Sequence, residues 1–492
     1  MAGVNIIFNM IKVFRLFILF VLVGSSTGNY VIDVSAIFDN HKSINDKLAT
    51  IKLIDKALQN DGYFIAINYN NISYLVDASI QSANSLFSLS NELKHKYSIE
   101  KLKSFGRGFL LFGKESGVST YFEVKEGFSY GYSSINEASH PPESLTHPMQ
   151  QANIWPNGLH TSDISNFEQL YYHKTIFAQA VLNSLARYLG EYFDDKYHNY
   201  DQYISTEIDG GELISLMRIF HYFSATPPPP SSTHTPTSSP PPSCNTPSLG
   251  EGRELIGSSP HTDWGLLTVI TWNGEPGLQF YNTTTHIWND LVLPDGVSYT
   301  DMMIVNGGDY LKLISKGRYR SPIHRVIHPS TTPTTTSTTC TDGNTAQCSS
   351  SDPQESQSQS LPSTASKDRL SFVYFFYPRH DSVIPRISTP SPGSDLTVGE
   401  RVGEVEAGDN DGVRGHFIDF EYNTLQKGES ASETVPECVL SQSSTSAVDD
   451  DTTRGHSKGG HNSDPYQDSN SINNVDLLFG DYIMSKWQGV YR

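Results

Sequence analysis

The residues best placed to do chemistry are His261 and Asp263, directly before the apolar, β-branched run Leu266–Ile270. Side chains two residues apart leave the same face of a β-strand, so the pattern predicts an imidazole and a carboxylate pointing to one place. Oxygen-activating ferrous sites use two histidines and one carboxylate on one face of the metal, because this leaves three coordination positions open. The sequence therefore supplies two of three such ligands here, and the third is expected farther along.

The third ligand has two candidates, His324 and His328, in the segment Gly317–His328. An even number of residues separates them in a predicted strand, so periodicity favours neither. Beyond them, Arg369 and Ser371 share one face of an alternating strand. A guanidinium fork beside a hydroxyl suits a carboxylate, so this pair is a candidate anion site.

In this order, the residues resemble the isopenicillin N synthase-like family of Fe(II), mostly 2-oxoglutarate-dependent, dioxygenases. The matching motifs are His-x-Asp, a distal histidine in Arg318–Val326, and Arg-x-Ser. The resemblance selects His324 over His328, and it implies the metal ligands His261, Asp263 and His324. It also implies a mainly β fold with flanking helices, in which an α+β N-terminal region precedes a double-stranded β-helix (jelly-roll) core.

The resemblance implies Fe(II), 2-oxoglutarate as cosubstrate and O2 as oxidant, with no catalytic residue beyond the metal centre. Arg369 and Ser371 would hold the far carboxylate of 2-oxoglutarate. Tyr222 resembles a family tyrosine that bonds the same group, although Phe223 follows it where relatives carry proline. The reaction implied is hydroxylation or desaturation of a small organic molecule, with decarboxylation of 2-oxoglutarate to succinate. Two alternatives are not decided by the sequence. One is a 2-oxoglutarate-independent oxidase, and the other is a catalytically silent barrel that acts as a binding protein.

Composition limits the partners. The net charge is -19, and residues 390–470 hold 16 acidic and 5 basic residues, a net of -11. This acidity argues against nucleic acid. The family resemblance implies a small-molecule substrate, and a monomer is expected. Met1–Gly28 reads as a signal or targeting segment, because an apolar run too short to span a bilayer follows basic residues. We expect the secretory pathway, with a bipartite plastid leader or a signal anchor as alternatives, and no stable membrane domain after leader removal.

Low-complexity segments divide the rest of the chain. Residues 224–250, 329–367 and 388–473 are too polar to bury much apolar surface and are predicted to be disordered insertions. An N-terminal dioxygenase region of strands and helices at 29–200 would precede the jelly-roll core at 201–387, which residues 474–492 complete with a terminal helix. The four cysteines (Cys244, Cys340, Cys348 and Cys438) fall in these insertions, as a bridge or as free thiols.

The second insertion is the main departure from the family pattern, because 45 positions separate His324 from Arg369. Arg369 still reaches the pocket if the tract loops out between two paired strands, since loop-closure entropy grows slowly with length. Elsewhere, periodicity predicts strands at 31–34, 63–67 and 213–223, and a long helix ending at Gly190. The region from Arg107, which includes Lys125–Gly131, reads as loop-rich, and Asn306–Asp309 reads as a turn.

Overall fold

The computed structural model describes residues 30–69, 72–115, 120–133, 147–192, 200–224, 253–328, 367–384 and 477–490. The predicted targeting segment and the four cysteines lie outside these residues. The three predicted insertions also lie outside them, apart from Ser224 and Lys367 at their edges.

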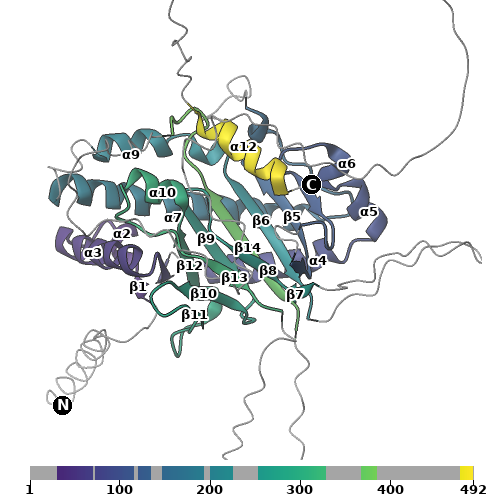
Figure 1. The fold of residues 1–492 in the computed structure, drawn as a ribbon, viewed down its shortest axis with the longest axis horizontal. Helices are drawn as coiled ribbons and strands as arrows, with labels where there is room; N and C mark the ends of the chain where they lie inside the picture. Colours follow the sequence, from purple (N-terminus) through teal and green to yellow (C-terminus); the bar gives the residue numbers. More distant parts are fainter. Residues whose placement is uncertain are drawn as a thin grey trace, which may run out of the picture.

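Two β-sheets face each other across one apolar cluster (Figure 1). In order across the sheet, the larger one holds β1 (Val31–Asp33), β2 (Tyr63–Ile67), β12 (Met302–Gly307), β9 (Leu267–Trp272), β14 (Arg369–Phe376), β6 (Leu216–Tyr222), β5 (Lys125–Gly131) and β3 (Gly108–Leu110). The smaller one holds β11 (Ile287–Asp290), β10 (Leu278–Asn282), β13 (His324–Val326) and β8 (Ser258–His261). Tyr63 of one sheet stacks on Phe280 of the other with ring centroids 3.7 Å apart. This sandwich agrees with the predicted jelly-roll fold class, although four of its strands, β1, β2, β3 and β5, come from the N-terminal region at 29–200. A separate parallel pair joins β4 (Tyr121–Glu123) to β7 (Glu254–Ile256).

Helices cover the outer face of the larger sheet. The longest, α7 (Thr161–Tyr192), buries an apolar stripe that includes Phe167, Phe177 and Leu185, and it runs two residues past the predicted end at Gly190. The other α-helices among the described residues are α2 (Ser35–Phe38), α3 (Ile44–Asn60), α4 (Ser73–Phe87), α5 (Asn91–Lys96), α6 (Ile99–Leu102), α9 (Tyr200–Ile208), α10 (Asp309–Ile314) and α12 (Phe479–Val490). In the part of the chain that the structure describes, no helix has the length and apolarity needed to cross a membrane.

The strand predicted to carry both His261 and Asp263 is in fact two strands. β8 ends at His261 and belongs to the smaller sheet, whereas β9 begins at Leu267 and belongs to the larger one. Asp263 therefore lies on the loop where the chain crosses between sheets. Gly265 permits this crossing, since a Cβ there would lie 2.6 Å from the carbonyl oxygen of Phe376.

The expectation that Lys125–Gly131 belongs to a loop-rich region was wrong. This segment forms β5, which pairs with β6 over its whole length. Its glycines suggested a loop, but they meet a packing need. A Cβ at Gly131 would lie 2.2 Å from the buried guanidinium of Arg107, so a side chain there would displace that guanidinium.

The route by which Arg369 reaches the core also differs from the prediction. β13 and β14, which flank the second insertion, do not pair; they lie in different sheets. β14 is instead held between β6 and β9, with Arg369 opposite Tyr222 and Ser371 opposite Phe220 and Trp272. The pairing of β14 with β6 and β9, rather than a hairpin with β13, therefore places Arg369 in the core.

Candidate metal centre

His261, Asp263 and His324 converge at one end of the sandwich. One potential ligand atom from each residue lies within 4.8 Å of the others. The Nε2 atom of His261 is 4.0 Å from Oδ1 of Asp263, and Nε2 of His324 is 3.8 Å from Oδ2 of the same carboxylate. His261 and His324 are direct partners in the β8–β13 ladder, which explains why two residues 63 positions apart meet.

Backbone carbonyls orient both imidazoles. Nδ1 of His261 lies 2.7 Å from the Ser259 carbonyl oxygen, and Nδ1 of His324 lies 3.0 Å from that of Pro322. A proton on each Nδ1 satisfies these acceptors and leaves the Nε2 lone pairs directed at the carboxylate side. Burial and the neighbouring His324 ring lower the pKa of His261, so its imidazole is neutral at pH 7, as a metal ligand must be.

Asp263 is held through its carboxylate and its backbone by residues that the sequence had suggested only as a turn. Nδ2 of Asn306, on β12, donates to Oδ2 of Asp263 at 3.3 Å, and the Asp309 amide donates to the Asp263 carbonyl at 2.8 Å. Gly308 makes this approach possible, since a Cβ there would lie 2.2 Å from the Gly265 carbonyl oxygen. No alternation of polar and apolar residues marked Asn306 in the sequence, because all six residues of β12 are buried.

We expect Asn306→Ala to weaken Fe(II) binding by about 10-fold to 100-fold, because loss of a hydrogen bond that orients a metal ligand has that typical effect. Chelator competition under anaerobic conditions measures the affinity. Asn289→Ala, which truncates an exposed asparagine on β11, is the control and should bind Fe(II) as the unaltered protein does. Equal affinities for all three proteins would contradict the role given to Asn306.

The motif that precedes His324 has a structural role. Nε and Nη2 of Arg318 donate to the two oxygens of Asp55, on α3, at 2.9 and 2.8 Å. The Tyr319 hydroxyl donates to Oδ1 of Asp55 at 3.1 Å. The segment that leads to the distal histidine is thus anchored on the N-terminal helix.

Asp55→Ala should lower the free energy of unfolding by about 3 kcal/mol, because it leaves a largely buried guanidinium without its carboxylate. Asp381→Ala is a matched control, since Asp381 also binds an arginine side chain, that of Arg379, but both side chains are about two-fifths exposed. An exposed pair contributes about 0–1 kcal/mol. Urea denaturation of both variants tests the difference, and equal losses would contradict it.

Arg369 lies inside the sandwich with Ser371 and Tyr222, all nearly inaccessible to solvent. Nη1 of Arg369 donates to the Glu275 carbonyl oxygen. Its Nε atom and the Ser371 hydroxyl are buried with no hydrogen-bond partner within the usual distance and angle limits. Burial lowers the pKa of Arg369 to about 10, so the guanidinium is still charged at pH 7. Burying a cation with an unbonded N–H costs free energy unless an anion accepts a hydrogen bond from it.

Comparison with known proteins identifies the family to which this chain belongs. Residues 31–158 match the family model described as non-haem dioxygenase in morphine synthesis N-terminal, and residues 234–378 match that of the 2OG-Fe(II) oxygenase superfamily. A 1-aminocyclopropane-1-carboxylate oxidase of Dictyostelium discoideum is 31% identical over 305 residues, 60% of this chain and 76% of the relative. The isopenicillin N synthase of a Flavobacterium species is 24% identical over 305 residues, 60% of this chain and 79% of the relative. The chain belongs to the 2OG-Fe(II) oxygenase superfamily.

The predicted family is thus confirmed, and the protein is an oxidoreductase of the 2-oxoglutarate-Fe(II) type that acts on a small molecule. Among solved structures, the crystal structure of a 2OG-Fe(II) oxygenase family protein from Caulobacter crescentus has 18% sequence identity to this oxygenase. The match has a TM-score of 0.48 and covers 74% of this chain and 90% of that chain.

The residues of this oxygenase fit its cofactors. Two imidazoles and a carboxylate are the donor set that non-haem Fe(II) oxygenases use. The free Nε of Arg369 and the hydroxyl of Ser371 fit a buried carboxylate, such as the far end of 2-oxoglutarate.

A charged wall lies beside Tyr222 in this oxygenase. Nζ of Lys125 is 2.8 Å from Glu123 and 3.2 Å from Glu115, which also binds Arg218 at 2.7 Å. Burial alone would raise the pKa of Glu115, but Arg218 and Lys125 lower it to about 2. The two carboxylates of this wall balance its lysine and its arginine, so the wall adds no net charge to the sandwich. Sequence periodicity gave no signal for it.

Trp487 of α12 packs on residues of the sandwich and of the loop that carries Asp263. Figure 1 shows α12, in yellow, across the ends of the strands. Trp487 packs on Trp264, the residue after Asp263, with ring centroids 5.0 Å apart, and it lies 4.6 Å from the Arg218 guanidinium. Trp264 therefore contributes to an aromatic wall that begins at the residue next to Asp263.

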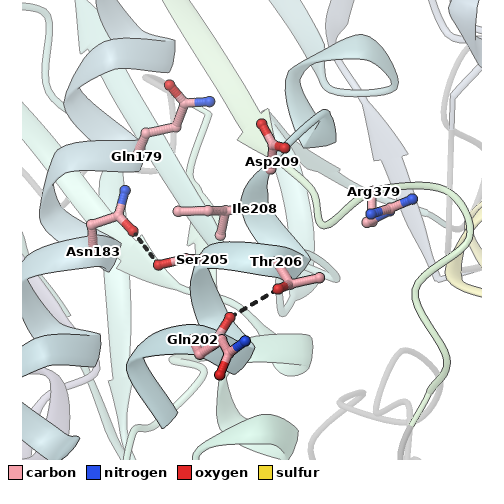
Figure 2. A pocket seen from close by; sticks show the side chains of 8 residues that line it. All are labelled: Gln179, Asn183, Gln202, Ser205, Thr206, Ile208, Asp209 and Arg379. Carbon is pink, nitrogen blue, oxygen red and sulfur yellow. Dashed lines mark hydrogen bonds between the residues drawn. The ribbon is translucent and has the colours of Figure 1, made fainter. Parts of the chain in front are cut away.

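Other polar residues of the oxygenase do not join the triad. His328 follows the end of β13, and His286 and His380 lie outside the metal-ligand group. A polar hollow between α7 and α9 is also separate (Figure 2). It is lined by Gln179, Asn183, Gln202, Ser205, Thr206, Ile208, Asp209 and Arg379. Arg379 is already bound to Asp381 there, so the hollow offers no arginine free for an anion.

Proposed function

We propose that His261, Asp263 and His324 hold the catalytic Fe(II), and that Arg369, Ser371 and Tyr222 hold the far carboxylate of 2-oxoglutarate. The observation that carries this proposal is the convergence of the three ligand atoms within 4.8 Å, with a charged and incompletely bonded arginine inside the same sandwich. The reaction would hydroxylate or desaturate a small organic molecule and release succinate and CO2.

The chain's own residues supply placement and exclude water. Arg369 fixes the cosubstrate at one end, and the buried Tyr222 lies opposite it in the β6–β14 ladder. Bound Fe(II) supplies the oxygen chemistry, and the protein leaves coordination positions open for it. The Trp264–Trp487 wall keeps the reacting end dry.

Anaerobic titration of the full-length protein with Fe(II) and then 2-oxoglutarate tests the proposal through the metal-to-ligand absorption band of the ternary complex. A substrate screen that reads stimulated succinate and CO2 release would follow. Formation of the band, and release of succinate in step with substrate oxidation, are the expected results. A protein that retains no Fe(II) would contradict the ligand assignment.

A 2-oxoglutarate-independent oxidase is the second candidate. It is favoured by the 31% identity to a protein named 1-aminocyclopropane-1-carboxylate oxidase, whose name gives a substrate with its own carboxylate. The free Nε of Arg369 suits either carboxylate. Substrate oxidation without succinate release would identify this alternative.

A further inference from the structure

The turn Asn273–Glu275, between β9 and β10, contacts Arg369 at both its backbone and its side chain. Oδ1 of Asn273 accepts from the Leu370 amide at 3.1 Å, and Nδ2 of Asn273 donates to the Asp368 carbonyl at 2.9 Å. A single side-chain amide therefore brackets the peptide units on either side of Arg369. The Glu275 carbonyl then accepts from Nη1 of the arginine.

The shape of this turn is fixed by its central residue. Gly274 has φ +86°, in the left-handed region, and a Cβ there would lie 2.8 Å from the Tyr299 ring. Only glycine fits both conditions without strain. The turn therefore presents the Asn273 side chain and the Glu275 carbonyl to the same arginine in a set geometry.

The start of β14 is tied on its other side to the end of β6. Oδ1 of Asp368 accepts from the Ser224 amide at 2.7 Å, and Oδ2 lies 2.8 Å from Nε2 of His221. Nδ1 of His221 lies 2.9 Å from Glu126 on β5. Because β13 and β14 do not pair, the placement of Arg369 depends on its strand register and on these local contacts.

We propose that Asn273 is a positioning residue that sets the orientation of the Arg369 guanidinium and thereby the affinity for 2-oxoglutarate. This inference rests on the proposed function, in which Arg369 binds the far carboxylate. Asn273 contacts the arginine's backbone neighbours and none of the three metal ligands. It should therefore act on cosubstrate binding and leave Fe(II) binding unchanged.

The test is anaerobic titration of the Fe(II)-loaded, full-length protein with 2-oxoglutarate. Calorimetry and the metal-to-ligand absorption band measure the binding. Asn273→Ala should weaken 2-oxoglutarate binding about tenfold, because it removes two hydrogen bonds. Its Fe(II) affinity should stay within about twofold of the unaltered protein. Asn282→Ala is the matched control, since the Asn282 side chain likewise accepts from two backbone amides, those of Thr284 and Thr285, in the β10–β11 hairpin.

A double-mutant cycle separates positioning from general loosening. In an Arg369→Met background, Asn273→Ala should weaken 2-oxoglutarate binding no further, because the side chain through which it acts is gone. A tenfold loss in that background, an equal loss in Asn282→Ala, or a parallel loss of Fe(II) affinity would overturn the proposal. Wild-type affinity in Asn273→Ala with weak binding in Arg369→Met would overturn this inference alone. Wild-type affinity in both variants would overturn the assignment of Arg369 as well.

Discussion

Asp263→Ala is expected to abolish Fe(II) binding and, with it, the absorption band that forms when 2-oxoglutarate is added. Asp263 is the single carboxylate of the triad, and its two oxygens lie 4.0 and 3.8 Å from the Nε2 atoms of His261 and His324. Removal leaves two imidazoles and no negative charge for a divalent cation. Loss of a residue that only orients a ligand already weakens binding about 10-fold to 100-fold, so loss of the ligand itself should exceed that range.

The two histidine candidates provide the comparison for this experiment. His324→Ala should also remove the band, whereas His328→Ala should retain it, because His328 lies beyond β13 and outside the metal-ligand group. Circular dichroism melting of each variant checks that the fold persists. A band that survives in His324→Ala and disappears in His328→Ala would mean that the distal ligand has been assigned to the wrong histidine.

The sequence predicted which three side chains converge better than it predicted the backbone that carries them. Motif order identified His261, Asp263 and His324, but strand periodicity wrongly placed the first two on one strand. The reason is that the chain changes sheets between β8 and β9, and this crossing depends on the close approach of Gly265 to Phe376. Contacts between residues far apart in sequence leave no periodic signal. Asn306 was missed for the same reason, since its role depends on an approach across β12 to the loop of Asp263.

In the N-terminal region, the sequence analysis predicted a loop where the structure has a strand. Lys125–Gly131 contains two glycines and a charged pair, which favour a loop by local propensity, yet it forms an interior strand of the larger sheet. Tertiary packing overrides propensity here, because Gly131 faces a buried arginine and Lys125 has buried carboxylate partners. In contrast, the alternation of Arg369 and Ser371 was a sound guide, because both side chains face the interior of a sheet whose other face is covered by helix.

Arg369→Met should leave Fe(II) binding intact and weaken 2-oxoglutarate binding by about 100-fold or more. Truncating one partner of a buried, hydrogen-bonded charge pair costs about 2–5 kcal/mol, and about 1.4 kcal/mol corresponds to a factor of ten. Methionine keeps much of the arginine's apolar volume, so the loss reports the guanidinium and not a cavity. The same anaerobic titration gives both affinities.

Arg325→Met is the control for that experiment, because Arg325 follows His324 but its guanidinium stacks on Trp288 at 4.2 Å and its Nε donates to Gln279. This variant should bind Fe(II) and 2-oxoglutarate as the unaltered protein does. If Arg369→Met kept full 2-oxoglutarate affinity, the buried Nε of Arg369 would have to serve another acceptor. The substrate's own carboxylate would be the first to test.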